Sequence, residues 1–259
     1  MCLPKPAPPT TSYSRMNSGP LLLYYITDRR QFRGSSADQI QQLLARITEC
    51  AAAGVDYIQL REKDLSAREL GKLAVKAFAA LPGNSPSKLL INSRLDVALA
   101  CGAHGVHLPA GDLNPGEARA LWSRASERAC VIGVSTHSAR EIALAESHGA
   151  DLAVFGPVFE KAVFEKAVFE KAVFEKAVFE KAGATNPGGL QQLQQVCQRS
   201  QAAVPPMPVL ALGGVTVQNA PQCLGAGCQG IAGIRLFQEM NAFTVVRTLR
   251  EQFAKTRNC

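Results

Sequence analysis

The sequence has no Cys-x-x-Cys pair and no group of histidines and cysteines at metal-ligand spacing. This absence argues against zinc-binding motifs and thioredoxin-like redox motifs. No apolar stretch approaches the roughly 20 residues that a membrane-spanning helix needs. The segment 1–20 also lacks the apolar core of a signal peptide. The eight cysteines are scattered along the chain, so we expect reduced thiols, a cytoplasmic protein and no membrane partner.

Lysine and arginine form no block interleaved with aromatic residues, although the formal net charge is +7 and the sequence pI is about 9.1. A nucleic-acid surface would need such a block, so we expect no nucleic-acid partner. The excess of positive charge instead favours small anionic ligands such as phosphorylated molecules. The length of 259 residues is close to the roughly 250 that are typical of one (β/α)8 barrel.

The stretch 131–138 changes abruptly in character. An apolar run at 131–134 ends in the hydroxyl and imidazole groups of Ser135, Thr136, His137 and Ser138. Ser138 and Glu141 then have the spacing of a helix capping box, and a second apolar run follows at 151–157. Two continuously apolar runs separated by one helix are typical of buried parallel strands. Because chemistry in such folds lies beyond the carboxyl ends of the strands, His137 is a candidate functional residue.

The same alternation of short apolar runs and amphipathic helices extends along the chain from Leu21. Ser36 and Gln39 have capping-box spacing at the start of the first helix, predicted over 36–53. Strands are predicted at 21–26, 57–60, 88–91, 105–108, 131–134, 151–157, 208–212 and 230–234, and a last helix at 242–254. Eight strands alternating with eight helices predict an α/β fold, a (β/α)8 TIM barrel.

Charged residues and glycines follow several of these strands. Arg61 and Lys63 lie two residues apart, so on an extended backbone their side chains would point the same way and would suit a phosphate. Paired glycines follow the seventh strand, where backbone N–H groups can approach a phosphate closely. The predicted phosphate-binding site, which we call the phosphate cup, consists of Gly213, Gly214, Ile234 and Arg235.

Two segments stand apart from the predicted barrel, which spans 21–259. Residues 1–20 contain five prolines and no acidic residue, so we expect a disordered tail. Between 158 and 182 the unit Val-Phe-Glu-Lys-Ala occurs five times in succession. A period of five matches neither helix nor strand, and we expect an insertion in the loop after the sixth strand. A role of this insertion in partner binding or self-association, and hence a homo-oligomer, is left open.

Several motifs together resemble the thiamine phosphate synthase and TenI-type superfamily. They are Gln59–Lys63 (Gln-Leu-Arg-Glu-Lys), Asn92-x-Arg94-x-Asp96, Gly105–Leu108, Gly133-x-Ser135-x-His137, Phe155–Phe159 and Gly213-Gly214. The resemblance covers Leu21 to about Phe237 apart from the repeat, and implies a barrel of the thiamine pathway that holds thiazole phosphate at the phosphate cup. The substrate-binding residues that it implies are Gln59, Arg61, Lys63, Asn92, Ser135 and Gly188, together with the phosphate cup.

Departures from the synthase pattern influence the choice within this superfamily. Where thiamine phosphate synthases have Asn-Asp after the third strand, this chain has Asn92-Ser93, and Asp112 would hold a magnesium ion without the second carboxylate. The Thr-x-Thr-Lys segment of the synthases is also missing. We therefore expect a TenI-type thiazole tautomerase, with His137 as general acid and base and no metal or other cofactor. The alternatives are a magnesium-dependent thiamine phosphate synthase and a non-catalytic phosphate-binding barrel.

Overall fold

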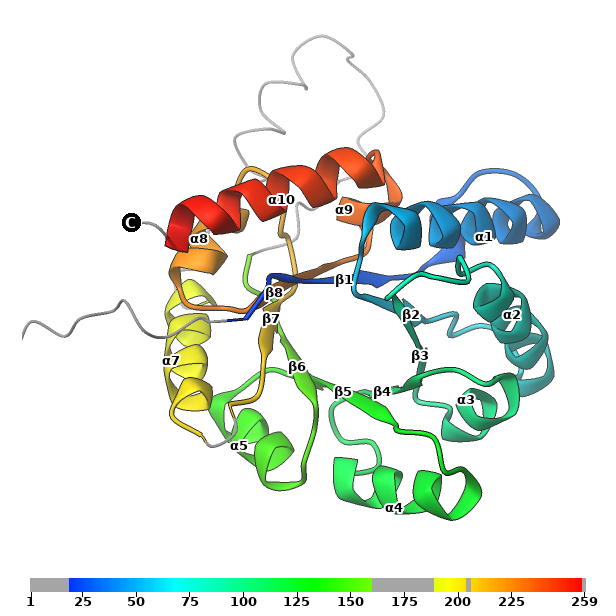
Figure 1. Ribbon diagram of the computed structural model, residues 1–259, viewed down its shortest axis with the longest axis horizontal. Helices are drawn as coiled ribbons and strands as arrows, with labels where there is room; N and C mark the ends of the chain where they lie inside the picture. Colours follow the sequence, from blue (N-terminus) through cyan, green and yellow to red (C-terminus); the bar gives the residue numbers. More distant parts are fainter. Residues whose placement is uncertain (1–18, 160–188, 204–205, 258–259) are drawn as a thin grey trace, which may run out of the picture.

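The computed structural model describes residues 19–159, 189–203 and 206–257. Eight parallel strands close into a barrel in which each strand pairs with its neighbours in sequence and β8 pairs with β1 (Figure 1). The strands are β1 (Leu22–Ile26), β2 (Tyr57–Leu60), β3 (Lys88–Asn92), β4 (Gly105–Leu108), β5 (Val131–Thr136), β6 (Leu152–Phe155), β7 (Val209–Ala211) and β8 (Gly230–Gly233). The predicted TIM barrel is confirmed, and every strand lies within two residues of its predicted bounds.

Helices surround the barrel and cover its outer face (Figure 1). They are η2 (Arg29–Gln31, a 3-10 turn), α1 (Ser36–Ala53), α2 (Ala67–Ala79), α3 (Leu95–Cys101), α4 (Pro115–Ala125), α5 (Ala139–Ser147), α7 (Gly189–Gln201), α8 (Ala220–Gly225), α9 (Arg235–Gln238) and α10 (Ala242–Arg257). The predicted count of eight helices is therefore exceeded within the described residues, because η2 and the short α9 were not predicted. No helix in the described ranges is long and apolar enough to cross a membrane.

The strands divide the hydrophobic core into two layers, because successive side chains on a strand point to opposite faces. One set of alternate residues, including Tyr24, Leu90 and Leu210, packs together inside the barrel. The other set packs against the helices in a larger cluster that contains Leu23, Ile58 and many helical residues. A residue's position in this alternation therefore decides whether its side chain enters the barrel.

The start of α1 differs from the prediction by one residue. Ser35, not Ser36, is the N-cap: its hydroxyl accepts a hydrogen bond from the N–H of Asp38, and the Asp38 carboxylate accepts one from the N–H of Ser35. Gln39 instead donates to the carbonyl of Phe32. The capping box predicted for Ser36 and Gln39 is wrong. Ser35 and Asp38 have the same spacing, and the negative charge of Asp38 is favourable in the first turn of a helix, whereas Gln39 is neutral.

The chain leaves and re-enters the described part of the barrel after β6. Val158 and Phe159 are buried, and their N–H groups donate to the carbonyls of Leu212 and Gly213 beyond β7. Gly189, where the chain returns, lies so close to Val158 that an added Cβ would be 2.1 Å from the Val158 carbonyl oxygen. The first two residues of the repeat thus belong to the barrel. The rest of the repeat and the tail residues 1–18 lie outside the described residues.

Candidate functional site at the carboxyl ends of the strands

Three predicted ligand-binding side chains lie at inward positions near the carboxyl ends of their strands. Gln59 on β2 and Asn92 on β3 are joined by a hydrogen bond of 2.7 Å from Nε2 to Oδ1. Gln59 is buried, and its Oε1 atom has no hydrogen-bond partner among the described residues. Ser135 lies at the matching inward position on β5. Because buried polar atoms are normally paired, the free oxygen of Gln59 is available to a donor on a ligand.

The two predicted cations differ in their surroundings. Arg61 directly follows β2 and is partly buried, and its charge contributes to lowering the pKa of His107 in the barrel interior. Lys63 is exposed and lies in a turn. Lys63 lies in a turn that begins at Glu62, whose carbonyl accepts a hydrogen bond from the N–H of Leu65, so the extended backbone expected from Arg61 to Lys63 does not form.

A buried ion pair between Arg29 and Glu62, next to Arg61 in the chain, was not predicted. Glu62 accepts hydrogen bonds from the guanidinium of Arg29 at 3.0 Å and from the hydroxyl of Thr27 at 2.6 Å. Arg29 also forms a bidentate pair with Asp64, with both distances 2.7 Å. These bonds, first those to Asp64, raise the pKa of Arg29 above its usual range despite its burial. The hydroxyl of Thr27 in turn accepts a hydrogen bond from the backbone N–H of Arg61 at 3.0 Å, so the cluster fixes the start of the β2–α2 loop.

Ser93 and Asp112 meet at the ends of β3 and β4. The Ser93 hydroxyl donates to one carboxylate oxygen of Asp112, and the N–H of Leu113 donates to the other at 2.8 Å. Ser93 has a positive φ of 63°, a conformation that aspartate and asparagine adopt more readily than most residues. Asp112 is exposed, so its carboxylate is open to solvent. The predicted metal-binding position therefore contains one carboxylate and one hydroxyl.

The side chains of Ser93 and Asp112 would fit a magnesium ion that is also bound by the phosphate groups of a substrate. No cluster of three or more histidine, cysteine or acidic residues occurs among the described residues, so the protein alone does not form a metal cage there. Magnesium, however, is commonly held by one or two carboxylates, with substrate phosphates and water completing the shell. Asp112 supplies one such carboxylate, and the Ser93 hydroxyl oxygen is a neutral neighbour. The site thus suits an ion that a pyrophosphate also binds.

His137 lies between β5 and α5, as predicted. Its Nδ1 atom is 2.5 Å from the carbonyl oxygen of Gly156 at the end of β6. A carbonyl only accepts, so Nδ1 carries the proton and Nε2 of the neutral ring is an acceptor. Its backbone N–H donates to the Glu141 carboxylate at 2.6 Å, while Ser138 caps the N–H of Glu141. Of the two hydrogen bonds of the capping box predicted at Ser138, only the one from the Glu141 N–H to the Ser138 hydroxyl forms. The Glu141 carboxylate accepts from the N–H of His137 in place of the N–H of Ser138.

A second histidine, His107 on β4, lies inside the barrel and was not predicted as a site residue. Its Nδ1 is 2.9 Å from the hydroxyl of Tyr24, and its Nε2 is 2.9 Å from the hydroxyl of Ser135. Gly133 on β5 is the residue paired with it in the sheet. A Cβ at Gly133 would be 2.9 Å from Nδ1 of His107, so the absence of a side chain there makes room for the imidazole.

Replacement of Gly133 by alanine is expected to lower the free energy of unfolding by about 1 to 3 kcal/mol, because the added methyl overpacks the interior against His107 and Leu152. Gly71→Ala is the matched control, since Gly71 lies inside α2 with nothing within 4 Å of its added Cβ. That control should be neutral or should stabilise by about 0.5 to 1 kcal/mol. Urea unfolding of both variants measures the difference, and equal effects would contradict the packing argument.

Backbone conformation favours glycine at positions 213 and 214 of the predicted phosphate cup, independently of any ligand. Gly213 has a positive φ of 95°, and a Cβ there would be 2.6 Å from Cα of Pro157. Gly213 is therefore required for the close contact between the loops that follow β6 and β7, whatever binds there. Gly214 also has a positive φ, of 63°. The remaining members of the phosphate cup, Ile234 and Arg235, begin the short helix α9 after β8. Gly188 lies outside the described residues.

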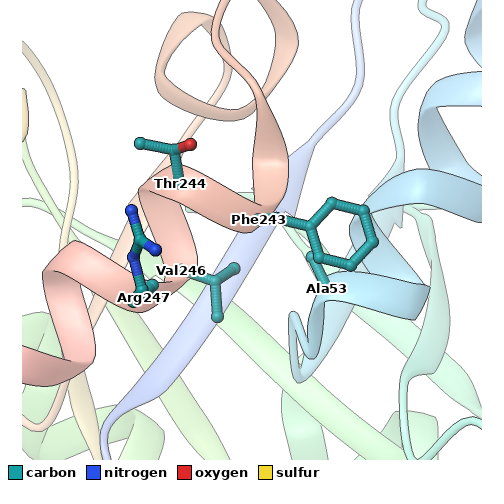
Figure 2. Close-up of a pocket in the computed structure, with 5 residues that line it drawn as sticks. All are labelled: Ala53, Phe243, Thr244, Val246 and Arg247. Atoms are coloured by element: carbon teal, nitrogen blue, oxygen red, sulfur yellow. The ribbon is translucent and has the colours of Figure 1, made fainter.

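A hollow on the outer surface is distinct from these strand ends. It has a volume of about 330 Å³ and lies between the end of α1 and the beginning of α10 (Figure 2). Its lining residues are Ala53, Phe243, Thr244, Val246 and Arg247. None of them belongs to a strand end, and Arg247 is the sole charged residue among them. The hollow lacks the several convergent polar groups that mark a small-molecule site.

Comparisons with known proteins identify the family to which the chain is similar. Residues 23–169 and 176–237 match the sequence model of a family described as thiamine monophosphate synthase. The chain is 33% identical over 234 residues to the thiamine-phosphate synthase of Methanoculleus marisnigri, covering 90% of this chain and 95% of that one. It is 34% identical over 212 residues to the thiamine-phosphate synthase of Methanospirillum hungatei, covering 82% and 87%. A thiamine phosphate pyrophosphorylase structure from Pyrococcus furiosus superposes with a TM-score of 0.66 at 25% identity, covering 91% and 96%.

Proposed function

The chain belongs to the thiamine monophosphate synthase family, and from this we infer that it is a transferase that joins hydroxymethylpyrimidine pyrophosphate to thiazole phosphate. The observation that carries the proposal is that relatives at 33% and 34% identity, matched over most of both chains, are named thiamine-phosphate synthases. The preference for a tautomerase, which the sequence suggested through Ser93, has no such support from those names. The missing aspartate is better understood as a variation within the synthase pattern.

The proposed reaction needs positive charge near the departing pyrophosphate and hydrogen bonds that fix the orientation of the pyrimidine. The thiazole nitrogen forms a bond to the methylene carbon of the pyrimidine, and the bond from that carbon to the pyrophosphate oxygen breaks. Arg61, partly buried at the end of β2, would attract the departing pyrophosphate. The free Oε1 atom of Gln59 and the hydroxyl of Ser135 would orient the pyrimidine, because both lie at inward positions. Lys63 is exposed and would act at longer range.

Magnesium would be held by Asp112 and by the pyrophosphate itself, with the Ser93 hydroxyl beside the carboxylate. When bound, magnesium neutralises charge that develops on the leaving pyrophosphate. The phosphate of the thiazole would lie at the phosphate cup, where the segments that follow β7 and β8 begin. Because Gly213 and Gly214 carry no side chain, a phosphate would be able to approach their backbone N–H groups closely.

Purified protein should form thiamine phosphate from the two substrates when magnesium is added, and chelator should abolish the product. His137→Asn should retain this activity within about threefold, because no step of the proposed transfer uses the imidazole as a proton carrier. Product formation is measured by chromatography of the reaction mixture. A wild type that forms no thiamine phosphate in the presence of magnesium would overturn the transferase assignment. Product formed in chelator would contradict the role of magnesium, and loss of product in His137→Asn would show that His137 takes part in the transfer.

A thiazole tautomerase is the second candidate, and the geometry of His137 favours it. The hydrogen bond from Nδ1 to the Gly156 carbonyl leaves Nε2 as an acceptor, which is the atom that a proton-transfer role would need. The same protein preparation should then convert the non-aromatic carboxythiazole phosphate to its aromatic isomer without magnesium. Loss of that conversion in His137→Asn, with no thiamine phosphate formed by the wild type, would establish this function instead.

A further inference from the structure

Three polar side chains form a chain of hydrogen bonds across the interior of the barrel. The hydroxyl of Tyr24 on β1 contacts Nδ1 of His107 on β4, and Nε2 of His107 contacts the hydroxyl of Ser135 on β5, each at 2.9 Å. Tyr24 and His107 are at most 2% exposed, so neither reaches a ligand in the mouth of the barrel. Ser135 is partly buried and lies two residues beyond the sheet partner of His107, toward the carboxyl ends of the strands.

Burial determines the protonation of the two inner members. Desolvation, with a smaller contribution from the charge of Arg61, lowers the pKa of His107 to about 3, so the ring is neutral and carries one N–H. Desolvation likewise raises the pKa of Tyr24, so its hydroxyl keeps its proton. The ring therefore donates from one nitrogen and accepts at the other, and the chain of bonds has a direction.

The environment of Tyr24 sets that direction. Its buried hydroxyl has His107 as its hydrogen-bond partner among the described residues. If Nδ1 of His107 carried the proton, the Tyr24 hydroxyl would accept that bond and its own proton would have no acceptor in the described interior. An unsatisfied buried donor is unfavourable. Tyr24 therefore donates to Nδ1, and His107 donates from Nε2 to the oxygen of Ser135.

The consequence appears at Ser135. Its oxygen accepts from His107, so its own proton is not needed for that bond and can be donated toward the mouth of the barrel. We propose that Tyr24 and His107 are positioning residues that make Ser135 a fixed hydrogen-bond donor, which selects substrates that present an unprotonated ring nitrogen or an oxygen acceptor at this point. The inference extends the proposed function, on which it rests for the identity of the substrate.

The tautomer of His107 is testable without any substrate. The full chain labelled with 15N-histidine contains four histidines, and His107→Gln assigns the resonance of His107. We expect the proton on Nε2, with no titration between about pH 5 and 8 because the ring stays neutral. In Tyr24→Phe, where the donor to Nδ1 is gone, a mixture of both tautomers is expected. A wild-type proton on Nδ1, or a ring that titrates in this range, would overturn the inference.

Kinetics test the consequence for Ser135. Tyr24→Phe and Ser135→Ala should each lower kcat/KM for the pyrimidine pyrophosphate by about tenfold, mainly through KM. The double variant should be no worse than Ser135→Ala alone, because both changes remove one coupled interaction. Tyr25→Phe is the matched control: Tyr25 is equally buried on the same strand, but it points outward and donates to Gln238 at 3.0 Å. It should lose stability with little change in kcat/KM.

Two results would contradict the proposal. Additive losses in the double variant would mean that Tyr24 does not act through Ser135, and an equal kinetic loss in Tyr25→Phe would mean that the effect is one of general destabilisation. A wild type that forms no thiamine phosphate would remove the proposed function but not the inference. The tautomer of His107 would still decide whether Ser135 is a donor.

Discussion

Asp112→Asn is expected to lower kcat/KM for thiamine phosphate formation by about a hundredfold or more. The carboxylate of Asp112 is the hard anionic ligand that the ends of β3 and β4 offer to magnesium, and the amide of asparagine offers a neutral oxygen instead. Loss of a direct ligand should exceed the roughly 10- to 100-fold effect of losing a residue that only supports a ligand. Initial rates over a range of magnesium concentrations measure the effect.

A substitution at Ser93, next to Asp112, adds a carboxylate to the proposed magnesium site instead of removing one. Ser93→Asp should lower the magnesium concentration for half-maximal activity by about tenfold, because it adds a second carboxylate at a positive φ that aspartate tolerates. Ser93→Asn separates conformation from charge and should not reproduce the gain. Asp96→Asn is the control for a carboxylate at the same mouth, since Asp96 is exposed and paired with Arg94. Equal magnesium dependence in wild type and Asp112→Asn would exclude this ion site.

Glu62→Gln is expected to lower the free energy of unfolding by about 3 to 5 kcal/mol. Arg29 is 5% exposed, and without the charge of Glu62 its guanidinium would remain buried with one of its two partners gone. The hydrogen bonds from Thr27 and from the backbone N–H of Arg29 would weaken as well. Urea unfolding of the full chain, with the midpoint and slope analysed together, measures the loss.

Two further variants identify the cause. Asp64→Asn should cost about 1 kcal/mol or less, because the Asp64 side chain is 39% exposed and its pair with Arg29 is partly screened by solvent. Replacing both buried partners, in Arg29→Met with Glu62→Leu, should restore much of the stability lost in Glu62→Gln, since no uncompensated charge is then buried. A double variant that is less stable than Glu62→Gln would show that packing, not charge, dominates here.

The elements of the barrel were predictable because their signals are local. Short apolar runs gave the strands, and Ser66 with Glu69 and Asn114 with Glu117 form the capping boxes that start α2 and α4. The alternation of side chains along each strand also explains why Gln59, Asn92 and Ser135 share the inner face of the barrel. A short apolar run does not reveal which of its two faces is inside, so those inward positions could not be derived from periodicity alone.

The ion pair between Arg29 and Glu62 and the hydrogen bonds of His107 have no local signal. Their partners are 33, 83 and 28 residues apart in sequence, and each residue alone resembles an ordinary polar residue next to a strand. Gly133 was noted only as part of a motif, whereas the structure shows that it makes space for the imidazole of His107. The choice between synthase and tautomerase was also beyond the sequence, because His137 and Asp112 are both present and each suits one reaction.

The contact between Val158 and Gly189 bears on how many copies of the repeat the barrel accommodates. The chain departs after Phe159 and returns at Gly189, and these two points are held together by the body of the barrel. The distance that the intervening segment must span is therefore the same for one copy of Val-Phe-Glu-Lys-Ala as for five, and the entropy of closing it grows only with the logarithm of its length. Adding or removing copies between these two fixed points is therefore expected to leave the eight strands where they are.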